Sequence, residues 1–155
     1  MNSPQKKTIQ IIVSVFIFVA VTVSIVSWDF MKNGPKAKQV KNDLEREFGL
    51  IEILPQSALV SHDASSKTRI AVVGASYLTD VNYQKIREHY DVELPKHGWE
   101  FQDEEQLGGG KGNFGGLTIN YCKGEYTATL YYAGDKVTSE WNYSLELSWG
   151  LHKCK

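Results

Sequence analysis

The sequence is poor in cysteine and almost neutral overall, and each of these two features excludes a class of protein. Two cysteines, Cys122 and Cys154, are too few for a disulfide-rich scaffold. A net charge of −1 gives no electrostatic reason to expect nucleic acid as a partner. Biased composition is confined to one glycine cluster at 108–116. The chain therefore has room for one ordinary folded domain of about 100 residues beside an unusual N-terminal third.

Charged residues are absent from 8–28, and the stretch 9–26 is almost wholly apolar. As an α-helix it would match a hydrocarbon core about 30 Å thick. We predict a short basic N-terminus at 1–8 and a transmembrane helix at 9–28, which makes the lipid bilayer the first expected partner. A cleaved signal peptide and a buried core helix are the alternatives. The residues expected to span the membrane are Ile9, Ile12, Phe16, Val19, Val23 and Val26.

The orientation of this helix rests on opposing signals. Lys6 and Lys7 precede it, but four lysines follow within 32–41, and that balance favours a cytoplasmic C-terminal domain. A signal-anchor so close to the N-terminus usually leads its carboxyl side across the membrane, and two cysteines that can pair suit an oxidising compartment. We expect an extracytoplasmic domain, periplasmic or at the cell surface.

The segment 29–55 is predicted to be a juxtamembrane helix and linker. Asn33-Gly34-Pro35 indicates a break followed by a helix start. Beyond it, apolar residues recur at helical spacing: Ala37, Val40, Leu44 and Phe48. This helix is either a stalk or an element that docks its thin apolar stripe on the following domain.

The region 56–155 is predicted to form an α+β domain. A strand at 69–78 precedes a helix whose apolar residues Tyr83, Ile86, Tyr90 and Leu94 share one face, with Thr79 or Asp80 as its cap. Pro95 and Gly98 end that helix, and alternation from Trp99 gives a second strand. The spacing therefore predicts a β-α-β unit.

The C-terminal third alternates apolar and polar residues and predicts an antiparallel meander of three strands, at 117–122, 126–132 and 141–151. A type II′ turn at Gly124-Glu125 would place Tyr121 opposite Ala128 and Ile119 opposite Leu130. The predicted architecture is one helix packed on the sheet formed by the β-α-β unit and the meander. Aromatic side chains expected to face that helix as core are Tyr83, Tyr90, Trp99, Tyr121, Trp141 and Trp149.

A short pattern in this domain consists of Tyr77-Leu78-Thr79-Asp80 before a helix, then His89-Tyr90-Asp91-Val92-Glu93-Leu94, then Gly98-Trp99. This pattern resembles small membrane-tethered or lipid-anchored bacterial extracytoplasmic proteins of unknown function. The resemblance covers little more than twenty residues and implies a bacterial envelope domain. It implies no catalytic residues, because that group has no assigned chemistry.

Motifs for enzyme chemistry are weak. The match of 110–115 to G-x-G-x-x-G precedes a strand instead of a helix, so no dinucleotide cofactor is expected. The acidic run at 103–105 lacks calcium-loop spacing and is predicted to be a solvated turn. The four histidines lack zinc spacing, and nothing selects Ser57, His62 and Asp63 as a hydrolytic set. We predict no catalytic, cofactor or metal site. The glycine-rich loop is the predicted partner contact, through Gly110, Lys111, Asn113 and Phe114.

Cys122 and Cys154 are predicted to lie near the same end of the sheet, where a disulfide forms if the C-terminal tail curls inward. The sequence as a whole indicates a single-pass, membrane-tethered, non-catalytic binding or structural module with another envelope protein as partner. An immunity or inhibitor protein that meets an incoming toxin is the first alternative. An envelope enzyme is the second, and it would require a deep cleft with convergent polar residues.

Overall fold

The computed structural model describes residues 3–106, 116–134, 140–151 and 154, although in the first helix it leaves out the side chains at 3–13, 16 and 25–32. Two helices and six strands follow one another along these residues. In chain order they are α1 (Ser3–Phe48), β1 (Ala58–Lys67), β2 (Ile70–Leu78), α2 (Tyr83–Lys96), β3 (Glu100–Gln106), β4 (Leu117–Lys123), β5 (Tyr126–Tyr132) and β6 (Tyr143–Trp149).

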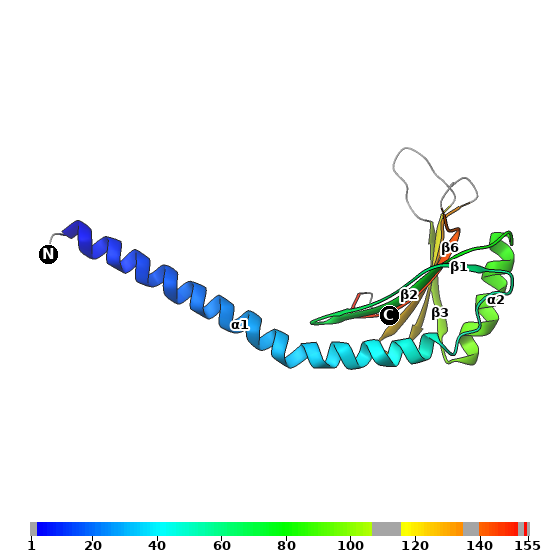
Figure 1. Cartoon of the computed structure of the whole chain (residues 1–155), viewed down its shortest axis with the longest axis horizontal. Helices are drawn as coiled ribbons and strands as arrows, with labels where there is room; N and C mark the ends of the chain where they lie inside the picture. The colour runs from blue at the N-terminus through cyan, green and yellow to red at the C-terminus, as the bar shows by residue number, and fades with distance from the viewer. Residues whose placement is uncertain (1–2, 107–115, 135–139, 152–153, 155) are drawn as a thin grey trace.

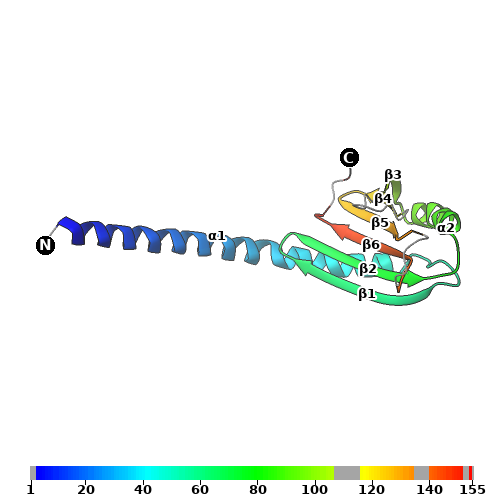
Figure 2. The same ribbon diagram turned by 90° about the horizontal axis from the view of Figure 1, so that it is seen from above.

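The strands form one antiparallel sheet in the order β1-β2-β6-β5-β4-β3, with β1 and β3 at its edges. Both helices lie on the same face of the sheet, and the N-terminal half of α1 projects far beyond the sheet (Figure 1). Viewed from above, the docked half of α1 runs beneath β1 and β2 (Figure 2). The domain therefore has two layers, and no described helix covers the second face of the sheet.

The docked half of α1 is part of the domain core. Ala37, Val40, Leu44 and Phe48, the residues predicted to form an apolar stripe, are all buried. Of the two alternatives for this segment, a stalk or a docked helix, the structure has the docked helix. The predicted break at Asn33-Gly34-Pro35 is wrong, because α1 continues through Pro35. Proline lacks a backbone donor and bends a helix, and α1 changes direction where its projecting half meets its docked half (Figure 1).

The second helix covers the β3 end of the same face. Its apolar residues Ile86, Tyr90 and Leu94 are fully buried, as their spacing predicts. The side chain of Asn82, instead of Thr79 or Asp80, accepts the backbone N–H of Lys85 and caps the helix. Of the predicted core aromatics, Tyr90, Trp99 and Tyr121 are buried, whereas Tyr83 and Trp149 pack at the margin of the core.

The prediction of a transmembrane helix requires correction. Within the part of the chain whose side chains are described, no helix is both long and apolar enough to cross a membrane. The uncharged stretch is not a separate element, because it belongs to a 46-residue helix that continues into a charged, sheet-bound half. Val19 and Val23 lie exposed on the projecting half, 50% and 58% accessible. Val19 and Val23 are the residues of the predicted span whose side chains the structure describes, and the side chains of Ile9, Ile12, Phe16 and Val26 lie outside the described residues.

The predicted sheet also differs from the observed one. β1 was not predicted, because its sequence ALVSHDASSK is mostly polar on both sides and lacks alternation. β3 extends through the acidic run 103–105 that was predicted to be a turn. The two strands of the predicted β-α-β unit, β2 and β3, are separated by β6, β5 and β4. The fold is therefore a six-stranded antiparallel sheet with two helices on one face, instead of a β-α-β unit with a three-strand meander and one helix.

The predicted hairpin is confirmed in its register. Tyr121 pairs with Ala128, Ile119 with Leu130 and Leu117 with Tyr132. Gly124 has a φ of 61°, a conformation that the first central position of a type II′ turn requires and that glycine adopts without strain. This register places the buried apolar residues of β4 and β5 on the helix-covered face.

Candidate functional site

The face of the sheet that no described helix covers, here called the open face, carries polar side chains in rows that cross all six strands. Thr127, Thr129 and Ser148 on this face are buried, and Asp63 is exposed. The pairing of neighbouring strands places one residue from each strand in a row. The central row contains Asp63, Gly74, Glu146, Thr129, Asn120 and Asp103. A second row contains Ser61, Ser76, Ser144, Tyr131, Thr118 and Glu105, and a third contains Ser65, Val72, Ser148, Thr127, Cys122 and Glu100.

The charges of the open face are all of one sign at these row positions. Asp63, Glu146, Asp103, Glu105 and Glu100 are acidic, and none of the eighteen positions holds lysine or arginine. Lys67, at the end of β1, is on the same side of that strand as Asp63 but lies beyond the three rows. The fold thus gathers five acidic side chains in these rows of an almost neutral chain.

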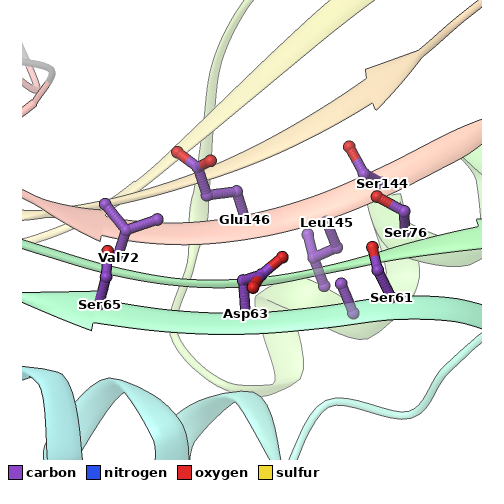
Figure 3. A pocket seen from close by; sticks show the side chains of 10 residues that line it. Ser61, Asp63, Ser65, Val72, Ser76, Ser144, Leu145 and Glu146 are labelled. Carbon is purple, nitrogen blue, oxygen red and sulfur yellow. The ribbon is translucent and has the colours of Figure 1, made fainter.

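A hollow of about 150 Å³ lies on this face over β1, β2 and β6. We call it the Gly74 hollow, after the residue at its floor. Figure 3 shows the side chains of Asp63 and Glu146 rising from β1 and β6 on the side away from α1. Four serines complete its polar lining, namely Ser61, Ser65, Ser76 and Ser144.

Gly74 opens the hollow because it has no side chain between the two carboxylates. It pairs with Asp63 on one side and with Glu146 on the other. A Cβ atom at this position would approach the carbonyl oxygen of Leu145 to 3.2 Å, a tight contact. Glycine within a strand often marks such a close approach. Any larger residue here would both crowd β6 and occupy the floor of the hollow.

The other half of the central row is tied together by hydrogen bonds. The Thr129 hydroxyl donates to Asn120 Oδ1 at 3.0 Å, and Asn120 Nδ2 donates to Asp103 Oδ1 at 2.7 Å. The Tyr131 hydroxyl lies in the adjacent row, where burial and then the negative charge of Glu146 raise its pKa. In contrast, no hydrogen bond or ion pair within the described residues engages Asp63. Glu100 and Glu105 share this property, but of the three only Asp63 lines the Gly74 hollow, where it is available to a ligand.

A second hollow, between the α1–β1 connection and α2, contains Glu93, His89 and Lys96. These three side chains already have partners in the protein, and His89 Nε2 lies 2.8 Å from the Glu52 carbonyl oxygen. The buried Glu93 carboxylate accepts the Glu52 backbone N–H at 2.9 Å and contacts Lys96 Nζ at 2.7 Å and His97 Nε2 at 3.0 Å. We interpret this cluster as a clamp that fixes the connection to α2.

The clamp makes stability depend on pH. The hydrogen bond from Lys96, followed by that from the Glu52 N–H, lowers the pKa of Glu93 from 4.5 to about 2. A lowered folded-state pKa stabilises the fold above the unfolded value and loses that contribution as pH falls from about 4.5 towards 2. Glu93→Gln should therefore lower the free energy of unfolding at pH 7 by about 2 kcal/mol, since hydrogen bonds to charged groups contribute about that much.

Urea denaturation at pH 7 and pH 3 measures this effect. The difference between Glu93→Gln and the original chain should shrink at the lower pH. Glu88→Gln is the matched control, because Glu88 is exposed on the same helix and should change stability little. An equal loss at both pH values would contradict the assignment of Glu93 as an ionised clamp.

On the helix side of the sheet, Arg87 is held by acidic and aromatic groups. Its guanidinium pairs with Asp91 and with Glu104 Oε2, and lies 4.9 Å from the centre of the Phe101 ring. The Tyr121 hydroxyl donates to Asp91 at 2.8 Å, and burial raises the pKa of Tyr121. These contacts join α2 to β3 and β4. Because the groups satisfy one another, the cluster is structural.

The sequence candidates for enzyme chemistry do not converge. Ser57 accepts a hydrogen bond from the Tyr143 hydroxyl at 2.9 Å, His62 packs against Phe48 beneath the sheet, and Asp63 lies on the open face. Adjacent strand residues point to opposite sides of a sheet, so His62 and Asp63 cannot act together. Over the described ranges, no three histidine, cysteine, aspartate or glutamate side chains are grouped to hold a metal ion.

The remaining predicted site residues have different outcomes. The sulfurs of Cys122 and Cys154 are bonded at 2.07 Å, with their Cα atoms 5.7 Å apart. The predicted contact loop, with Gly110, Lys111, Asn113 and Phe114, lies outside the described residues.

The sequence did not predict that Asp63 and Glu146 flank Gly74 on the open face. Glu146 occupies a polar position of the predicted last strand, but Asp63 could be placed beside it only if β1 were known.

Comparison with known proteins adds no further constraint. No protein-family model matches the chain, and no curated protein or solved structure matches it either. The resemblance to small bacterial extracytoplasmic proteins therefore stays a prediction.

Proposed function

We propose that this protein is a non-catalytic binding module that acts outside the cytoplasm and recognises a positively charged group of a partner protein through the Gly74 hollow. The observation that carries the proposal is the placement of Asp63 and Glu146 on either side of Gly74, on a face that no described helix covers. Two carboxylates separated by an open floor suit an ammonium or guanidinium group, which can donate hydrogen bonds to both.

The lining supports binding more than catalysis. The four serine hydroxyls add donors and acceptors around the carboxylates, but no histidine among the described residues lies beside them on the open face. A serine nucleophile needs an adjacent base within hydrogen-bond reach. The hollow is also small, about 150 Å³, whereas ligand pockets of enzymes are larger, mostly apolar clefts with a few convergent polar groups.

The disulfide supports a location outside the cytoplasm. Disulfides persist in oxidising compartments and are rare where thiols are kept reduced. The bond between Cys122 and Cys154 fixes Cys154 to β4 on the open face, beside Thr127 of β5. We expect protein recovered from its own compartment to contain no free thiol. Alkylation before reduction measures this, and it should label neither Cys122 nor Cys154.

The recognition of a cation is tested by NMR titration with Nα-acetyl-lysine methylamide. We expect shifts of the Gly74 amide and its neighbours, and the matched norleucine compound should leave them unchanged. Asp63→Asn should weaken binding about tenfold, because it removes one charge-assisted hydrogen bond. Salt should weaken binding as well, since the site is open to solvent.

Glu105→Gln is the control variant. Glu105 is an exposed acidic residue on the same face but at the opposite edge of the sheet. If binding were due to the general negative charge of the face, Asp63→Asn and Glu105→Gln would weaken it equally. That result, or shifts that are centred away from Gly74, would contradict the proposed site.

A further inference from the structure

The first edge strand of the sheet offers an unpaired backbone beside the Gly74 hollow. β1 has ten residues and, among the residues that the structure describes, pairs with β2 alone. After a bulge between Leu59 and Ser61, its register against β2 is regular at 61–67. Such a strand exposes N–H and C=O groups to which another extended chain can hydrogen-bond.

The two edges of the sheet differ in a way that favours β1. β3 is shorter, carries a bulge between Phe101 and Asp103, and has four acidic residues among its seven. Bulges and charged side chains are the means by which proteins block an edge strand. The regular part of β1 has only one acidic residue, Asp63, and one lysine, Lys67. β1 is thus the edge that a further strand can join.

The helix layer holds β1 in position. α1 runs beneath it, and the Phe48 ring meets the His62 ring edge-on with centroids 5.8 Å apart. A strand that joined β1 would therefore meet a supported edge. Its alternate side chains would lie on the open face, beside Ser61, Asp63 and Ser65.

We propose that β1 binds an extended, basic segment of a partner protein, which adds to the sheet as a seventh strand and places a lysine or arginine beside Asp63 at the Gly74 hollow. Main-chain hydrogen bonds would provide affinity and the hollow would provide specificity, as in other cases of strand addition. The charge argument rests on the proposed function. The backbone argument rests on the edge strand alone.

The test uses the full chain and a synthetic peptide, acetyl-Val-Thr-Val-Lys-Val-Thr-Val-amide, in which lysine and threonine share one side. We expect saturable binding by NMR, with new protection of β1 amides from hydrogen exchange. A peptide with glutamate in place of lysine should bind at least about tenfold more weakly, because like charges then face each other. Methylation of alternate peptide nitrogens should weaken binding at least about tenfold, because main-chain hydrogen bonds are lost.

The outcomes separate the two proposals. If Nα-acetyl-lysine methylamide binds at Gly74 but methylation of the peptide backbone changes nothing, strand addition is overturned and the hollow remains a cation site. If methylation abolishes binding while Asp63→Asn and the glutamate peptide have no effect, the edge binds strands but the cation site is overturned. If the peptide shifts only residues of β3, or fails to bind at millimolar concentration, strand addition at β1 is wrong. Glu105→Gln, the control at the other edge, should bind the lysine peptide like the original chain.

Discussion

Removal of the disulfide by Cys122→Ser together with Cys154→Ser should lower the free energy of unfolding by about 3 to 4 kcal/mol, because the cross-link closes a loop over a separation of 32 residues. The main cause is the entropy that the unfolded chain regains when the loop opens. The bond also holds the tail against β4 and β5, where the Cys154 sulfur lies 3.2 Å from the carbonyl oxygen of Tyr126.

Chemical denaturation with and without reductant measures this effect. The double variant should unfold at a lower denaturant concentration than the oxidised chain and at the same concentration as the reduced chain. Cys154→Ser alone should resemble the double variant, because either change removes the cross-link. Equal midpoints for the oxidised and reduced original chain would contradict a disulfide that contributes to stability.

Leu44→Ala should destabilise the domain by about 3 kcal/mol, because it leaves a cavity between α1 and the sheet. Leu44 is 2% accessible and belongs to the same buried cluster as Val40 and Phe48. The loss follows from the docked position of α1. A helix that acted only as a stalk would tolerate the change.

Lys38→Ala is the matched control for this substitution. Lys38 lies on the same helix but its side chain is exposed, so its replacement should alter stability little. Thermal unfolding followed by circular dichroism compares the two variants. If Leu44→Ala and Lys38→Ala melted at the same temperature as the original chain, the assignment of 37–48 to the domain core would be wrong.

The two substitutions also bear on the candidate site. β1 is supported by α1, so a loosened α1 should weaken peptide binding at the edge without changing any residue of the Gly74 hollow. The Cys122–Cys154 bond, in contrast, lies in the third row of the open face, towards β4. Its removal should leave cation binding at Gly74 intact as long as the domain remains folded.

The sequence by itself determined the elements in which local pattern and burial agree. The hairpin register followed from the alternation in β4 and β5 and from the glycine at position 124. A shift by one residue would expose the whole apolar face. The spacing of Ala37, Val40, Leu44 and Phe48 gave a helix with one buried stripe. These features depend on residues that are close together in the chain, so their periodicity reveals them.

Only the tertiary structure decided the order of the strands and the candidate site. β1 is polar on both sides because one side is open to solvent and the other lies at the margin of the helix layer, so its sequence has no period to recognise. The interpretation of 9–28 as a separate membrane rod failed for a similar reason, since a stretch judged alone does not show the long helix that contains it. Asp63 and Glu146 are 83 positions apart, and they meet across Gly74 because β6 pairs with β2. Pairing between distant strands depends on contacts of the whole sheet, which no local pattern encodes.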